Sequence, residues 1–281
     1  MGTSKSYGGP GSGLVPSWVD DVVAPAVPAS SPTSDDAVPD QGLTPGQTPP
    51  RAPDTAGTGT YTGARRMFSN FARTGSTSSL GGALRRHVAS SGGPRKAASR
   101  MGAARSTGGR LLGFVRDALQ SGVDEALRVR GLQQLAGQSA EAVFLGLIEV
   151  ICPPGGPIDE AIARQALLDA IGDQVEAGMD DFESMSPDQL KEFFLDFVIR
   201  SIEGRVMSDI GAKGVILPDD VDDVIALQEQ LHDFIAGSCR SHLAAELGAV
   251  ERLTDRQLDG KIDAIYQAAF GLIADEGEAA E

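Results

Sequence analysis

Apolar residues recur at every third or fourth position along most of the chain after residue 104, which is the spacing of an amphipathic helix. The clearest stripe consists of Leu190, Phe193, Phe194, Phe197, Val198, Ile202 and Val206. Comparable stripes predict further helices over residues 105–127, 139–152, 157–178, 218–247 and 254–273. Alternating β-branched residues between turns, which would indicate strands, are absent. The sequence therefore predicts an all-α fold, with a bundle of about five to seven helices over residues 104–275.

Two of these helices have well-defined starts. Ser186 is followed directly by Pro187 and then by Gln189, which predicts a capping box with proline at the first helical position. Thr254 and Gln257 form a second capping box. At the other end of the bundle, we expect residues 276–281 to form an acidic tail that frays.

The first 60 residues lack this periodicity. They contain ten of the sixteen prolines and are rich in Gly, Ser and Thr. A segment of this composition cannot bury enough apolar surface to offset the entropy that it would lose on ordering. We therefore expect a long, largely disordered Pro/Gly/Ser-rich N-terminal arm, with a distinct motif at residues 1–18 and a proline-rich linker at residues 19–60.

The motif at residues 1–18 reads MGTSKSYGGPGSGLVPSW. Trp18 is the only tryptophan of the chain, and we expect it either to anchor in a partner's pocket or to fold back on the chain's own helices. Removal of Met1 would leave Gly2 with an unhindered amine to which a group could be attached; its match to the myristoylation pattern is short and weak. The candidate partner-binding residues of the motif are Thr3, Ser4, Tyr7, Leu14, Val15, Pro16 and Trp18.

Charge is segregated along the chain. The net charge of −15 divides into −4 for residues 1–60, +10 for residues 61–130 and −21 for residues 131–281. Residues 61–103 form a basic Gly/Ser/Arg-rich segment with short helices, whose candidate partner-binding residues are Arg65, Arg66, Phe68, Phe71, Arg85 and Arg86. One interpretation is electrostatic docking onto an acidic surface, either of this chain or of a partner protein. The alternative is a nucleic-acid-binding sensor that uses residues 65–110 for phosphate contacts and stacking.

Three groups of residues are candidates for metal or phosphate binding. His232, Cys239 and His242 share one side of a predicted helix, but their spacing does not match a usual zinc site. The aspartates at 219, 220, 222 and 223 suit a helix start better than a cation site. The glycine-rich runs at residues 8–13 and 153–156 lack the Lys-Ser/Thr ending of a phosphate-binding loop. The sequence thus predicts no metal, no cofactor and no enzyme class.

Location follows from two further observations. The chain has only two cysteines, Cys152 and Cys239, which is typical of a protein in a reducing cytoplasm. No apolar run approaches the roughly 18–20 residues needed to span a bilayer. We expect a cytoplasmic protein without a membrane partner.

Three stretches resemble the QatB family, the B component of the bacterial Qat anti-phage defence system. They are the opening MGTSKSYGGPGSGLVPSWVDD, the basic segment with RRMFSNFARTG, LGGALRRHVASSGG and AASRMGAARSTGGRLLGF, and the helical EVICPPGGPIDEAIARQALLDAI with RSIEGRVMSDIGAKG. The resemblance covers most of the chain, with the proline-rich linker least constrained.

The resemblance implies a set of partners and a role. QatB-like proteins are encoded with a Qat ATPase (QatA-like), a QueC-like protein (QatC-like) and a TatD-like nuclease (QatD-like), and the B component looks like the one without chemistry of its own. QueC-like enzymes activate a carboxylated deazapurine with ATP. The implied function is a non-enzymatic adaptor that presents Gly2 to the QueC-like partner, as substrate or ligand, and docks the ATPase through its helical domain.

Overall fold

The computed structural model describes residues 60–153, 158–178, 185–211, 215 and 217–281, which all lie in one compact unit spanning residues 53–281. Within these ranges the chain forms α-helices and short 3-10 helices and no strand, so the prediction of an all-α fold is confirmed. The N-terminal segment of residues 1–52 is assigned to a separate unit and lies outside the described residues.

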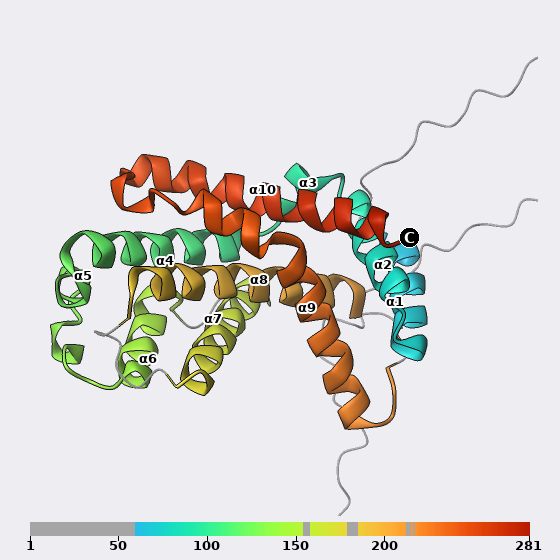
Figure 1. Cartoon of the computed structure of the whole chain (residues 1–281), viewed down its shortest axis with the longest axis horizontal. Helices are drawn as coiled ribbons and strands as arrows, with labels where there is room; N and C mark the ends of the chain where they lie inside the picture. The colour runs from blue at the N-terminus through green and yellow to red at the C-terminus, as the bar shows by residue number, and fades with distance from the viewer. Residues whose placement is uncertain (1–59, 154–157, 179–184, 212–214, 216) are drawn as a thin grey trace, which may run out of the picture. The chain divides into compact units, whose positions relative to one another are not determined.

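The helices follow one another along the chain as shown in Figure 1. Their bounds are α1 Thr62–Thr74, α2 Thr77–Ser90, α3 Pro94–Ser99, α4 Gly102–Ser121, α5 Val123–Val129, α6 Ala140–Ile151, α7 Ile158–Glu176, α8 Pro187–Gly211, α9 Val221–Glu246 and α10 Asp255–Ala279, with 3-10 turns at Gln133–Leu135 and Val250–Arg252. Seven of them, α4 to α10, make up the predicted C-terminal bundle.

Helix α8 lies at the centre of the described bundle. It packs against α4, α7 and α9, and in Figure 1 it runs alongside α4, which in turn lies beside α10. Every residue from Phe193 to Ile199 is buried, so the middle of the helix is enclosed on all sides rather than along one stripe. Apolar residues of this stretch point to several sides of the helix, so neighbouring helices must cover each of those sides.

Local signals set where the helices start and stop. Ser186 accepts a hydrogen bond from the Gln189 amide, and the Gln189 side chain accepts one from the Ser186 amide, which confirms the predicted capping box of α8. The capping box at Thr254 is also present. The predicted stripe at 105–127 proves to be two helices, because Gly122 takes a positive φ of 86° that ends α4. Helix α9 begins after its N-cap Asp220, slightly later than the predicted start at Pro218.

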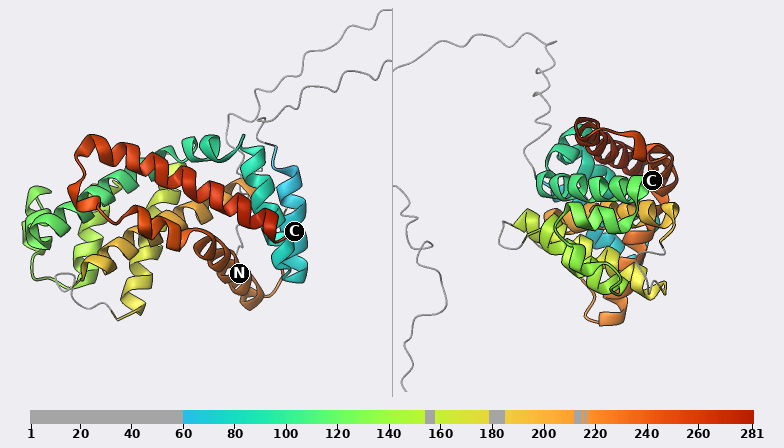
Figure 2. Two further views of the ribbon diagram at one scale, coloured as in Figure 1. Left: turned by 45° about the horizontal axis from the view of Figure 1, so that its top comes forward. Right: turned by 90° about the vertical axis from the view of Figure 1, so that its left-hand side faces the viewer.

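The basic segment of residues 61–103 is part of the same compact unit as the bundle. Its helices α1, α2 and α3 fold onto one end of the bundle, where α2 and α3 pack against α10. Figure 2 shows the C-terminal half of α10 reaching the α1–α2 end of the molecule. These helices contribute to one continuous hydrophobic core, so the segment is not a separate domain of short helices.

The expectation of a frayed acidic tail at residues 276–281 is wrong. Helix α10 continues to Ala279, and Glu281 forms ion pairs with Arg85 and Arg86 of α2. The contact is close because glycines face each other: a Cβ on Gly277 would lie 2.5 Å from the backbone oxygen of Gly81. A methyl group on either helix at this crossing would push the two backbones apart.

One buried polar contact joins α10 to the central helix. The Tyr266 hydroxyl lies 2.8 Å from Ser201 Oγ of α8, and Ser201 in turn donates to the Val198 carbonyl. Burial raises the pKa of Tyr266, which keeps the phenol neutral. Both hydroxyls are therefore satisfied inside the core.

We expect Gly277→Ala to lower the free energy of unfolding by roughly 1–3 kcal/mol, because its methyl group has no space beside Gly81. Gly271→Ala is a matched control in the same helix, where an added Cβ meets no atom within 4 Å. Higher helix propensity should make that control more stable by about 0.5–1 kcal/mol. Urea denaturation of the two variants measures the difference, and equal stability would contradict the close helix contact.

Candidate partner-binding surface

The predicted binding residues divide into two groups. Gly2, Thr3, Ser4, Tyr7, Leu14, Val15, Pro16 and Trp18 lie outside the described residues, so their assignment stays a prediction. Arg65, Arg66, Phe68, Phe71, Arg85 and Arg86 all lie on α1 and α2. Their placement shows which of them a partner could reach.

Most of the predicted arginines bind the chain itself. Arg65 donates to two backbone carbonyls at the end of α8, those of Asp209 at 2.8 Å and Ile210 at 3.2 Å. Cations are favourable at this position because carbonyl groups at a helix C-terminus lack partners. Arg85 and Arg86 pair with Glu281. The structure thus forms the intramolecular version of the predicted docking of a basic segment on acidic helices.

The two phenylalanines do not belong to a binding surface. Phe68 and Phe71 are buried, and their rings meet edge to face with centroids 5.5 Å apart. Neither ring can stack on a base or enter a partner's pocket in this fold, which corrects their assignment as partner-binding residues. Their spacing places both phenylalanines on the face of α1 that packs into the core.

A polar cluster that the sequence analysis missed joins α2 to α8. His87 is 1% exposed, and its Nε2 lies 3.0 Å from Asp209 Oδ2. Its ring stacks on Tyr61 at 4.9 Å between centroids. Arg205 also contacts Asp209, at 3.1 Å. Burial alone would raise the pKa of Asp209, but the hydrogen bond with His87 and the charge of Arg205 hold it below its usual value.

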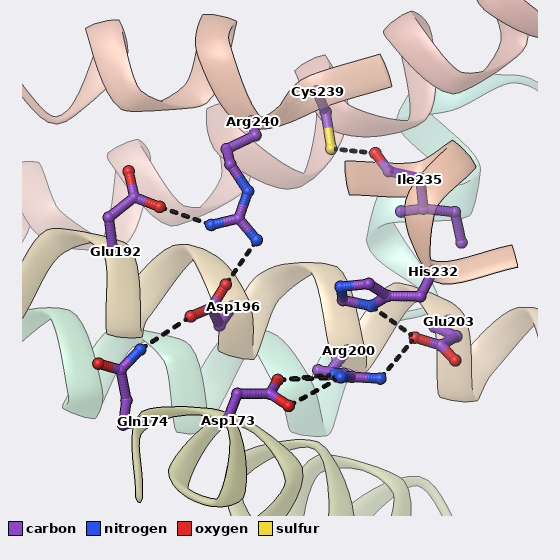
Figure 3. A network of polar contacts seen from close by, with 10 residues as sticks. All are labelled: Asp173, Gln174, Glu192, Asp196, Arg200, Glu203, His232, Ile235, Cys239 and Arg240. Carbon is purple, nitrogen blue, oxygen red and sulfur yellow. Dashed lines mark hydrogen bonds and ion pairs between the residues drawn. The ribbon is translucent and has the colours of Figure 1, made fainter. Parts of the chain in front are cut away.

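A second polar network connects α7, α8 and α9 (Figure 3). Arg240 of α9 reaches two carboxylates of α8, Glu192 at 2.5 Å and Asp196 at 2.6 Å. Gln174 of α7 donates to the other oxygen of Asp196 at 3.1 Å. Burial raises the pKa of Asp196 even though Arg240 opposes the shift. The carboxylate is thus held inside the bundle by its partners.

The same network includes His232, one of the residues that the sequence offered as a possible metal ligand. Arg200 binds Asp173 through three nitrogen–oxygen contacts of 2.9, 3.0 and 3.1 Å, and it also contacts Glu203 at 3.5 Å. His232 Nδ1 lies 3.3 Å from the same glutamate, as Figure 3 shows. In the part of the chain that the structure describes, no three His, Cys, Asp or Glu side chains are grouped so as to hold a metal ion.

Cys239 has a packing role. It is fully buried, and its Sγ donates to the Ile235 carbonyl one turn earlier at 2.9 Å (Figure 3). Burial raises the pKa of its thiol to about 12, so it carries almost no thiolate at neutral pH. His242, by contrast, is exposed on the surface of α9. The side chains of His232, Cys239 and His242 therefore do not meet at one centre, although they were predicted to share one side of a helix.

The acidic start of α9 is used for capping. The side chain of Asp220 accepts a hydrogen bond from the Asp222 amide at 2.8 Å, and Asp222 and Asp223 occupy the first turn. Carboxylates at this position satisfy free amides and complement the helix dipole. The predicted structural role of these aspartates is confirmed for Asp220.

Two of the surface cavities among the described helices each have a volume of about 620 Å³. The first is an arginine-rich groove beside α4 and α10, in which Arg116 and Arg130 both pair with Asp117 and Arg110 donates to the Ile151 carbonyl. The second lies between α1 and the start of α9 and includes Arg66. No described helix is long and apolar enough to cross a membrane.

A family model described as the Qat anti-phage system associated protein QatB matches residues 92–273, nearly two thirds of the chain. The chain belongs to the QatB family. No curated protein and no solved structure gives a significant match. QatB membership makes this protein a component of the Qat anti-phage system.

The QatB match runs from the end of α2 to near the end of α10. It contains the network of Figure 3 and all seven helices of the bundle except the last turns of α10. The tip with Gly2, the helix α1 and all six predicted residues of α1 and α2 precede it. Family membership therefore rests on the helical bundle, and it does not by itself assign the binding residues.

We expect Asp209→Asn to lower the free energy of unfolding at pH 7 by roughly 1.5–3 kcal/mol, because its charged hydrogen bonds to His87 and Arg205 are partly buried. The folded-state pKa of Asp209 is depressed, so its stabilisation is present above the ordinary aspartate pKa and is lost as the pH falls through the folded value. Urea titrations between pH 7 and pH 3 should show the wild-type advantage shrinking over that range.

Asp263→Asn is the matched control, since its carboxylate is 56% exposed and pairs with Arg105 at the surface. We expect it to change stability by less than about 1 kcal/mol. If the two variants lost equal stability, Asp209 would not have the role assigned to it here.

We expect Arg240→Gln to destabilise the bundle by roughly 1–3 kcal/mol at pH 7, because Asp196 would keep a buried charge without its cation. Adding Asp196→Asn should restore part of the loss. The gap between single and double variants should narrow as the pH falls, since the pKa of Asp196 is raised and protonation removes the charge. Arg128→Gln, on an exposed pair with Glu125, should leave the denaturation midpoint unchanged.

Proposed function

We propose that this QatB family member is a non-enzymatic adaptor of the Qat anti-phage system. It presents its N-terminus, Gly2 after removal of Met1, to a QueC-like partner, and it docks the Qat ATPase through its helical domain. The family match over residues 92–273 is the observation that carries the proposal, because it assigns the bundle to the Qat system. The resemblance of the first 21 residues to the start of QatB proteins supports the role of the tip.

The side-chain contacts fit a scaffold. The carboxylates and arginines of Figure 3 join α7, α8 and α9. The ion pairs of Glu281 with Arg85 and Arg86 join the end of α10 to α2. The Cys239 thiol, with its raised pKa, is a poor nucleophile. These groups hold helices together, which supports a structural role for the chain within the system.

Gly2 is suited to be an acceptor. Its amine has no side chain next to it, and the glycine-rich residues around it allow an enzyme to surround the chain closely. A QueC-like partner would supply a carboxyl group activated by ATP. The amine attacks the carboxyl carbon, the bond from that carbon to the ATP-derived leaving group breaks, and an amide forms with loss of a proton.

Burial of the aromatic residues favours this adaptor over a nucleic-acid sensor. Stacking needs accessible rings, whereas Phe68 and Phe71 are in the core. Three of the arginines in the basic segment, Arg65, Arg85 and Arg86, are already occupied within the chain. Fewer cations are thus available to replace the counterions of a phosphate backbone.

We expect the protein co-expressed with the QueC-like partner to have a higher intact mass than the protein expressed alone, with the increase located on the N-terminal peptide. A partner made inactive in its ATP site is the first control. Gly2→Pro is the second, because it replaces the primary amine with a hindered secondary one. An N-terminal peptide of identical mass in all samples would refute the modification.

A further inference from the structure

The face of α1 opposite its core side carries a polar stripe. Arg66, Ser69, Asn70 and Arg73 follow the helical period on the side opposite the buried Phe68 and Phe71. Arg66 and Arg73 are two turns apart, which separates them by about 10 Å along the helix axis. Arg66 and Arg73 are both exposed.

This stripe forms one wall of the cavity of about 620 Å³ between α1 and the start of α9, here called the α1–α9 pocket. Its lining residues are Arg66, Ser69, Asn70, Ala72, Arg73, Leu217, Pro218 and Asp223. Leu217 is 41% exposed and gives the lining a large apolar side chain that a ligand can reach. The volume of the pocket is within the range of known ligand-binding pockets in proteins.

The charges of the pocket are not balanced within the described chain. Arg66 has no hydrogen bond or ion pair with any described residue. Arg73 donates only to the Asn70 side chain, at 2.8 Å, and Asn70 is itself held by Ser79. Against these two guanidinium groups the lining offers one carboxylate, that of Asp223. Guanidinium groups at such a site favour a carboxylate-bearing ligand.

We propose that the α1–α9 pocket docks an acidic peptide segment of a partner protein. The segment places a large apolar side chain against Ala72, Leu217 and Pro218, and it places carboxylates on Arg66 and Arg73. The assignment deepens the adaptor function proposed above and rests on it, since it gives the adaptor a surface for a partner.

The lining favours a peptide over nucleic acid. Among the lining residues there is no aromatic ring on which a base could stack. Two arginines on one helix make too few phosphate contacts for strong binding of a duplex. A lining that combines apolar residues with arginines is, in contrast, typical of protein–protein interfaces.

A displayed library of random short peptides, selected against the immobilised full-length protein, tests the pocket without knowledge of the partner. We expect the wild-type protein to enrich sequences in which acidic residues flank a large apolar one. An enriched peptide should bind the Arg66→Glu/Arg73→Glu variant about tenfold more weakly or worse. Arg95→Glu is the matched control, an exposed arginine of α3 outside the pocket, and it should bind the peptide as the wild type does.

A second variant, Ser69→Trp, fills the pocket without changing its charge and should also abolish peptide binding. Unchanged melting temperatures would show that each variant is folded. Selection of no acidic–apolar motif, or equal binding by the doubly charge-reversed variant, overturns the proposal. So does a labelled DNA duplex that binds the wild type in preference to the selected peptide. The mass of the N-terminal peptide is measured independently of peptide binding. Failure of the proposed pocket and failure of the proposed modification of Gly2 can therefore be told apart.

Discussion

Burial of α8 on all sides is the constraint on which the rest of the bundle depends. From Phe193 to Ile199 every residue is enclosed, so α4, α7 and α9 must each cover a face. The same enclosure brings Asp196 into the interior, where Arg240 and Gln174 supply its partners. Polar contacts between α7, α8 and α9 are therefore a consequence of the packing, and they fix how these helices are oriented with respect to one another.

The second determinant is the closure of the chain between α2 and α10. Gly81 and Gly277 allow the two backbones to approach closely, and the charges of Arg85, Arg86 and Glu281 complete the contact. His87 and Asp209 add a buried link from α2 to α8. As a result the basic N-terminal helices are part of the folded unit, although the QatB match begins only at Gly92.

This arrangement separates the structural and interaction roles of the basic segment. Arg65, Arg85 and Arg86 are used within the chain, whereas Arg66 and Arg73 face the α1–α9 pocket. On α1 the position along the helix separates Arg65 from Arg66 and Arg73, since residues three or four apart share a face and adjacent residues do not. One helix can thus bind the bundle with one side and leave the other for a partner.

The helical class, the capping boxes at Ser186 and Thr254 and membership of the QatB family could all be predicted from the sequence, because they depend on local periodicity, local hydrogen bonds and recurring motifs. The conformation of the C-terminal tail could not be predicted in this way. Its composition is acidic, but it is helical because it packs against the glycines and arginines of α2. The same holds for the contacts of His87 with Asp209 and of Arg240 with Asp196, whose partners lie far apart in sequence. Spacing along one helix predicts which residues share a face, but the neighbour that the face meets is chosen by the packing of the whole chain.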